Sequence, residues 1–255
     1  MIHTNNFSYL KVAVVSKKLF LIRSMLKEDI EPCVDLIVNC HESYHPMMIC
    51  LNFNKKLYSE LIRRKIQSVI DEGLSIVCLD LTSKKIVGVC LGCDALTQDN
   101  GECDDILQQY PEYRYYQELM GVFSKKYPKY FSPETRGISC IPFNLTIEQK
   151  YQSFGLATEI LKVIVDEHPK YCRYSYLLTN AMSDHAVKFC YNLCKIQNYR
   201  VFHVIDAIES EKWKSSDGKR PFSNIKYELT KRGLEPEHIF YKFILWERAP
   251  IKPKL

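Results

Sequence analysis

Apolar residues along this chain follow two different spacings. Short runs of β-forming residues have the length of strands. Between them, apolar positions recur every three or four residues, as they do on one side of a helix. The extended runs cover residues 19–22, 75–81, 85–93, 137–147, 174–179, 200–208 and 239–245. The helical stretches begin near Ile30, Asn54, Leu156 and Ser183. The order β-α-α-β-β-β-α-β-α-β-β predicts an α/β chain.

Two stretches interrupt this alternation. Residues 97–136 lie between the third and fourth predicted strands and are rich in tyrosine, whereas residues 210–233 lie between the last two strands and contain charged residues, Gly and Pro. A structureless loop as long as the first stretch is uncommon in a compact domain, so we expect helical turns there. We expect the second stretch to be a partly mobile excursion. The chain 1–255 is then one domain, with its core over about 19–245.

The amino-acid composition indicates the broad class of protein. The chain has 255 residues, 46% of them hydrophobic, which is enough for a substantial core. Its net charge is +5 and its basic residues are scattered, which does not indicate a nucleic-acid partner. With no membrane-length apolar stretch and no signal-peptide pattern, we expect a cytoplasmic protein without a membrane partner. The eleven cysteines mostly lie in apolar runs, which fits buried thiols, and their spacing matches no standard metal site.

One strand-to-helix turn has the features of an anion site. It follows the extended run that ends at Ile147, and its residues are Gln152, Ser153, Phe154, Gly155, Leu156 and Ala157. Such a turn directs several backbone N–H groups and the positive end of a helix dipole to one point, which favours a pyrophosphate. Gly155 lets a ligand approach the backbone, and the small Ala157 lets the first helical turn lie close. The alternative is an ordinary turn with a glycine at a tight corner.

The pattern Gln-x-x-Gly-x-Ala at this turn resembles the acetyl-CoA signature of the GCN5-related N-acetyltransferase (GNAT) superfamily. The order of elements from about Leu19 to Leu245 is similar to the same superfamily. The resemblance implies a GNAT fold, with a mixed central sheet of about seven strands flanked by helices and an insertion after the third strand. It also implies that backbone at Ile147 and at Gln152 to Ala157 holds acetyl-CoA, without a metal. The insertion then forms either a wall of the acceptor pocket or a peripheral decoration.

Further segments resemble the invertebrate arylalkylamine N-acetyltransferases. Tyr44-His45-Pro46-Met47 falls where that family has an acidic-Pro-Leu motif, and residues 72–77 and 86–89 match its Gly-Leu-Ser and Gly-Val segments. This resemblance implies direct attack by the primary amine of a small molecule, such as an arylalkylamine. The family's glutamate, its proposed general base, aligns with His45. The ordinary histidine pKa of about 6.5 suits proton transfer near neutrality, so His45 is either the base or a loop histidine without a chemical role.

The acid that protonates the departing thiolate is less clearly marked. Many relatives place a tyrosine in the helix after the fifth strand, at a position that falls on Cys190 here, and Tyr191 follows one residue later. One position rotates a side chain by about 100° around a helix, which would turn Tyr191 away from the site. Cys190 itself fits a core thiol. Arylalkylamine enzymes of invertebrates use serines in this region, and Ser183 is the serine in that place.

Three functions remain open from the sequence. The first is an acetyl-CoA-dependent N-acetyltransferase acting on a small amine. The second is a catalytically degenerate relative that binds acyl-CoA, which the replaced glutamate and displaced tyrosine favour. The third is an enzyme that acetylates a protein N-terminus or lysine, and this function would need an open groove. Because the final strands of this fold often pair between subunits, the resemblance also allows a homodimer.

Overall fold

A computed structural model of the chain describes residues 9–51, 53–97, 103–137, 139–182, 184–196, 201–234 and 240–247. These residues contain one eight-stranded sheet of order β1-β2-β3-β4-β5-β6-β8-β7. The strands are β1 (Leu10–Val15), β2 (Lys18–Ser24), β3 (Ile76–Asp80), β4 (Lys85–Asp94), β5 (Ser139–Ile147), β6 (Tyr176–Ala181), β7 (Val201–Glu209) and β8 (Phe240–Glu247). Neighbouring strands are antiparallel except β5 and β6, which are parallel. The sheet is therefore mixed, as predicted.

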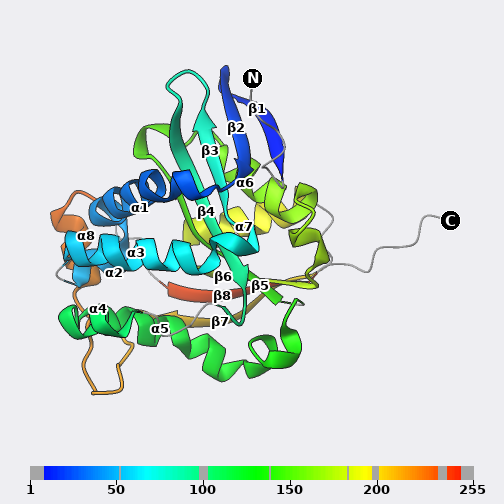
Figure 1. Cartoon of the computed structure of the whole chain (residues 1–255). Coiled ribbons are helices and arrows are strands. Elements are labelled where there is room, and N and C mark those ends of the chain that lie inside the picture. The colour runs from blue at the N-terminus through cyan, green and yellow to red at the C-terminus, as the bar shows by residue number, and fades with distance from the viewer. Residues whose placement is uncertain are drawn as a thin grey trace.

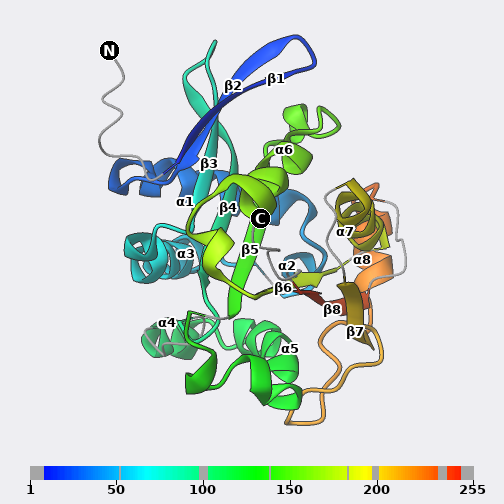
Figure 2. The same ribbon diagram turned by 90° about the vertical axis from the view of Figure 1, so that its right-hand side faces the viewer.

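Helices cover both faces of the sheet. They are α1 (Ile30–Tyr44), α2 (Pro46–Cys50), α3 (Lys55–Val69), α4 (Asp104–Gln109), α5 (Tyr113–Lys126), α6 (Leu156–Lys162), α7 (Asp184–Ile196) and α8 (Ile225–Lys231). A π-helix, Val163–Glu167, continues α6. Figures 1 and 2 show α1 and α3 on one face and α6 and α7 on the other. None of the helices in the described ranges is long and apolar enough to cross a membrane.

The strands in the middle of the sheet are buried from both sides. Val77 of β3 belongs to the core beneath α1 and α3, whereas its neighbours Ile76 and Cys78 belong to the core beneath α6. Successive side chains of a strand point to opposite faces, so a strand between two helical layers is apolar at every position. The continuous apolar runs in the sequence have this cause.

Gly88 of β4 explains how α6 lies so close to the sheet. A Cβ at this position would lie 2.8 Å from Cδ1 of Ile147 and 3.1 Å from Cδ1 of Ile160 on α6. Glycine therefore leaves room for β5 and α6 to pack against β4. The short Gly-Val segment noted in the sequence has this local role, which fixes the position of the turn that begins α6.

The insertion after β4 is helical, as expected, and consists mainly of α4 and α5. Phe123 of α5 stacks on Tyr241 and Phe243 of β8, with ring centroids 5.0 and 5.1 Å apart. At the base of the insertion, the Asp94 carboxylate accepts from the Leu96 and Gly137 backbone N–H groups. The insertion is thus fixed at its base and packed across the second half of the sheet.

The stretch 210–233 contains α8 and a series of turns. Phe222 and Ile225 are fully buried, and the Tyr115 hydroxyl of α5 donates to Asp217 at 3.0 Å. These contacts attach the stretch to α5 and to the core beneath α1 and α3. Whether it moves in solution stays a prediction.

The sheet contains one strand more than the seven expected. β1 pairs along its whole length with β2. The turn between them has Ser16 and Lys17 at φ +49° and +64°. Such hairpin turns normally carry Asn or Gly, so the residues at this turn do not predict a hairpin. The short helix α2 was also not predicted.

Candidate functional site

β5 and β6 run side by side only at their beginnings. Their parallel register pairs residues 139–140 with 176–177 and then stops. Beyond this point β5 stays paired with β4, and β6 with β8. The Thr179 hydroxyl donates to the Pro142 carbonyl at 3.2 Å across the widening gap. The two strands therefore diverge and leave an opening within the sheet.

A cavity of about 270 Å³ occupies this opening. Its wall includes His41 of α1, His45 directly after α1, Tyr58 of α3, and Tyr113 and Tyr116 of α5. From the other face of the sheet, α6 and α7 contribute Leu161, Phe189 and Cys190. The cavity therefore crosses the sheet, with an aromatic, polar end beneath α1, α3 and α5 and an apolar end beneath α6 and α7. The described wall residues include no Asp or Glu.

β5 carries a bulge where it lines the cavity. The register pairs Val89 with Thr146 and Leu91 with Phe143, so two residues of β5, Asn144 and Leu145, fall opposite one residue of β4. Asn144 has φ +48°, which is uncommon for a residue other than glycine. The strand register gives neither bulge residue a partner on β4. The bulge therefore interrupts the pairing with β4 beside the cavity, which both residues line.

The strand-to-helix turn expected between Ile147 and Leu156 is formed, and its role as an anion site stays a prediction. After β5, Ser153 and Gly155 take φ +68° and +84°, and α6 begins at Leu156. A Cβ on Gly155 would meet only Val15, at 3.9 Å, so the space beside the glycine is open. Lys18 of β2 lies over the Phe154 ring, 5.6 Å from its centroid. The turn thus combines the start of a helix, an open approach and a nearby cation.

Ile147 joins this turn to the end of α1. Its carbonyl accepts from the Tyr44 hydroxyl at 2.9 Å and from the Gln152 side-chain amide at 3.3 Å. Burial raises the pKa of Tyr44, so the hydroxyl keeps its proton. The Ile147 carbonyl is therefore engaged by the protein's own side chains. The residues predicted to hold acetyl-CoA, Ile147 and Gln152 to Ala157, form one continuous segment from the strand end to the helix start.

No protein-family model matches this sequence, and no curated protein matches it either. Solved structures match it in shape. The C-terminal condensation domain of Ebony, in complex with β-alanyl-dopamine, has a TM-score of 0.67 at 16% identity, over 94% of this chain and 100% of that one. A polyamine N-acetyltransferase of Drosophila melanogaster, which forms N-acetylagmatine, has a TM-score of 0.61 at 9% identity, over 89% of this chain and 99% of that one. A putative arylalkylamine N-acetyltransferase of the yellow fever mosquito Aedes aegypti has a TM-score of 0.57 at 15% identity, over 95% of this chain and 94% of that one. The chain has the GNAT fold.

His45 ends one helix of this GNAT fold and begins the next. Because the residue before a proline avoids the helical conformation, His45 has ψ 114° and separates α1 from α2. Its Nδ1 accepts from the Met48 backbone N–H at 3.3 Å, which caps α2. Burial lowers the pKa of His45 to about 4. In the neutral ring the proton is therefore on Nε2, and a role as base, which stays a prediction, would require Nδ1 to release Met48.

The structure describes two of the three residues considered for the acid. Tyr191 lies on the outer side of α7, with 42% of its surface exposed, whereas Cys190 is buried and lines the cavity. This is the rotation that the sequence suggested. Ser183 lies outside the described residues. The identity of the acid therefore stays a prediction.

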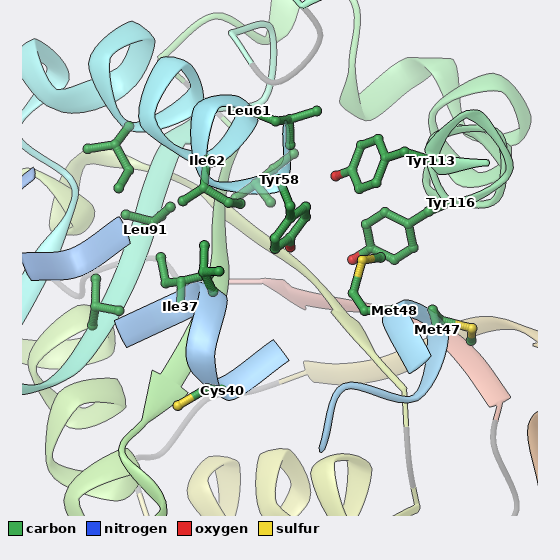
Figure 3. Close-up of a cluster of buried hydrophobic side chains, with 14 of the residues drawn as sticks. Ile37, Cys40, Met47, Met48, Tyr58, Leu61, Ile62, Leu91, Tyr113 and Tyr116 are labelled. Carbon is green, nitrogen blue, oxygen red and sulfur yellow. The ribbon is translucent and has the colours of Figure 1, made fainter. Parts of the chain in front are cut away.

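Several residues of the cavity wall are not marked by any sequence motif. His41 and Tyr58 recur with the apolar positions of their helices, as core residues do. Figure 3 shows Tyr113 and Tyr116 pointing from α5 toward Tyr58. His41 carried one usable signal, since it is a titratable residue on the buried side of an amphipathic helix. Thr179 gave no signal, because its importance depends on where two strands diverge.

Proposed function

We propose that this protein is an N-acetyltransferase that transfers the acetyl group of acetyl-CoA to the primary amine of a small molecule. The observation that carries the proposal is the divergence of β5 from β6 around the bulge at Asn144, with a cavity that crosses the sheet at this point. Such an opening lets a thioester enter from one face and an amine from the other. Direct transfer needs these two groups to meet within one enclosed site.

The end beneath α6 and α7 suits the donor. The N–H groups at the start of α6 and the nearby Lys18 favour the pyrophosphate, and the open space beside Gly155 lets it approach. From this turn, β5 leads back along the cavity to the bulge. We propose that Ile147 and Gln152 to Ala157 form this binding segment, with the apolar wall at Leu161 and Phe189 beside the thioester arm.

The bulge suits the chemistry of acyl transfer. When the amine attacks the thioester carbonyl, negative charge develops on the carbonyl oxygen, and fixed N–H donors stabilise it. Asn144 and Leu145 line the cavity at the bulge, and we propose that a backbone N–H of this bulge supplies such a donor. The C–S bond then breaks and the thiolate takes a proton. For this acid we retain Ser183 and Tyr191 as candidates, and the exposure of Tyr191 makes it the weaker one.

The end beneath α1, α3 and α5 suits a small acceptor. α5 covers this end with Tyr113, Tyr116 and Met120, whereas a protein N-terminus or lysine would need an open groove. Similar structures include amine N-acetyltransferases named for arylalkylamines, agmatine and polyamines. The described wall has no carboxylate to bind a second cationic group, which favours a monoamine such as an arylalkylamine over a polyamine.

We also propose a cytoplasmic location. Seven of the eight cysteines whose side chains are described are buried thiols. Buried thiols without disulfides are typical of a reducing compartment. Gel filtration with light scattering would test the homodimer that the resemblance allows.

The proposal is tested by titrating the purified protein with acetyl-CoA in a calorimeter and then measuring thiol release with a panel of amines. The panel contains arylalkylamines, polyamines, amino acids, amino sugars and a peptide with a free N-terminus. Binding with turnover on a small amine supports the proposal, and turnover on the peptide alone identifies a protein acetyltransferase. Tight binding without turnover indicates the degenerate relative. Absence of acetyl-CoA binding contradicts the proposal.

A further inference from the structure

Two side chains in the cavity wall are joined by a short hydrogen bond. Nδ1 of His41 and the hydroxyl of Tyr58 lie 2.6 Å apart. His41 comes from α1 and Tyr58 from α3, and the two are 6% and 1% exposed. Both side chains belong to the described wall at the aromatic end of the cavity. A hydroxyl and an imidazole nitrogen in this arrangement can exchange a proton without moving.

The surroundings keep both groups neutral. His45, which directly follows α1, lies beside His41 with the ring centroids 4.5 Å apart, and the Tyr113 ring of α5 lies 5.8 Å from the Tyr58 ring. Farther along α3, the Lys65 ammonium lies over the Tyr113 ring. Burial, and then the neighbouring His45, hold the pKa of His41 well below its usual 6.5. Burial and the tyrosines of the insertion raise the pKa of Tyr58 well above 10.

His45 is poorly placed to act as the base itself. Its Nδ1 accepts from the Met48 N–H, and its Nε2 then carries the proton of the neutral ring. The described wall offers no carboxylate as a substitute. When the Tyr58 hydroxyl donates to His41, the lone pairs of Tyr58 Oη stay free to accept from a group in the cavity. These contacts indicate Tyr58 and His41 as the pair of residues that can accept the proton of the amine.

We propose that Tyr58 and His41 form a proton relay that deprotonates the acceptor's ammonium group. One proton moves from the ammonium nitrogen to Tyr58 Oη as the hydroxyl proton moves to His41 Nδ1. The products are a neutral amine, a neutral tyrosine and an imidazolium, so charge and protons balance and no bond to carbon changes. Tyr58 is the catalytic residue and His41 acts through it. The relay rests on the proposed acetyltransferase function.

The relay is tested with Tyr58→Phe and two acceptors of different basicity. An alkylamine with a pKa of about 10 is charged at pH 7 and needs a base, whereas an aniline is already neutral. For the alkylamine, we expect Tyr58→Phe to lower kcat/KM at pH 7 by about 100-fold. This loss in kcat/KM becomes about tenfold smaller with each pH unit, because free amine forms in solution. The kcat/KM of the wild type stays constant over the same pH range. For the aniline, the variant and wild type are equal.

Two further variants complete the test. His41→Gln removes the final proton acceptor and gives the same dependence on pH and amine. Tyr110→Phe is the matched control, because Tyr110 is an equally buried tyrosine whose hydroxyl donates to the Leu51 carbonyl at 2.9 Å. We expect Tyr110→Phe to change the stability of the protein without a loss of activity that depends on pH or on the amine. Thermal unfolding verifies that each variant is folded.

The outcomes separate the two proposals. A loss that is the same at every pH and for both amines, while wild type is active, overturns the relay and leaves the acetyltransferase in place. Full activity of both relay variants on the alkylamine at pH 7 overturns the relay in the same way. A wild-type protein that acetylates no amine overturns the proposed function and the relay together.

Discussion

The hydroxyl of Thr179 on β6 donates to the Pro142 carbonyl on β5, with 3.2 Å between the two oxygens. This contact follows directly after the last backbone pairing between the two strands. It is a side-chain bond at the place where the sheet opens. Thr179 therefore helps to set how far the strands diverge and where the cavity begins.

Replacing Thr179 with valine removes this bond while nearly preserving the shape of the side chain. We expect a loss of about 1 kcal/mol in the free energy of unfolding, because the Pro142 carbonyl loses its partner. We also expect a higher KM for acetyl-CoA. Thr230→Val is the control, since Thr230 makes a similar bond to the Lys226 carbonyl on the exposed side of α8. Equal effects of the two variants on KM would contradict a role for Thr179 in the opening.

Gly155→Ala separates backbone strain from ligand binding. Gly155 and Gly218 have φ +84° and +82°, so alanine at either position costs about 1–2 kcal/mol of stability. Only Gly155 lies at the proposed pyrophosphate turn. We expect Gly155→Ala to raise the Kd for acetyl-CoA about tenfold, which corresponds to 1.4 kcal/mol, and Gly218→Ala to leave it unchanged. Calorimetric titration measures both, and unchanged binding by Gly155→Ala would place the ligand elsewhere.

Gly92→Ala tests the close packing of β4. A Cβ at Gly92 would lie 2.0 Å from the Tyr171 hydroxyl and 2.9 Å from the Leu74 carbonyl oxygen. Tyr171 donates to that same carbonyl at 2.6 Å, so the clash also disturbs a buried hydrogen bond. We expect a loss of about 1–3 kcal/mol in the free energy of unfolding.

Gly121→Ala is the matched control for Gly92→Ala. Gly121 lies within α5, and a Cβ there meets nothing within 4 Å. Alanine in a helix interior is favoured over glycine, so we expect a gain of about 0.5–1 kcal/mol. Urea denaturation measures both variants. A stable Gly92→Ala protein would show that the strand and Tyr171 can move apart.

His168 makes the protein sensitive to acid. Its side chain is fully buried, and its Nδ1 accepts from the Lys170 N–H at 3.2 Å. Burial, and then the Lys170 charge, lower the pKa of His168 to about 4. The unfolded chain, with a pKa near 6.5, takes up the proton first, so stability is full above pH 6.5 and falls toward pH 4. The loss is about 3 kcal/mol at most.

His168→Gln removes this contribution. We expect the variant's free energy of unfolding to fall less steeply between pH 6.5 and 4, measured by urea denaturation at several pH values. His45 has a pKa lowered in the same direction, so some acid sensitivity remains in the variant. An unchanged slope would show that His168 is not held neutral in the folded protein.

Local sequence patterns predicted most of the element order and the strand-to-helix turn at Gly155. Strands between two helical layers are apolar at every position, and helices with one buried side repeat every three or four residues, so local patterns reveal both. The turn at Gly155 is also local, because it depends on one glycine between a strand and a helix. Local patterns do not predict β1, because its turn at Ser16 and Lys17 uses residues that rarely form such turns.

The residues that form the cavity are brought together by the packing of separate helices and strands. His41 and Tyr58 look like core positions of two separate helices, and their 2.6 Å contact exists only after α1 and α3 pack together. The bulge at Asn144 depends on the register with β4, and the opening depends on where β6 leaves β5. These relationships join residues far apart in the chain. Local sequence patterns cannot predict these relationships, because each arises from packing between elements rather than from the residues within a single element.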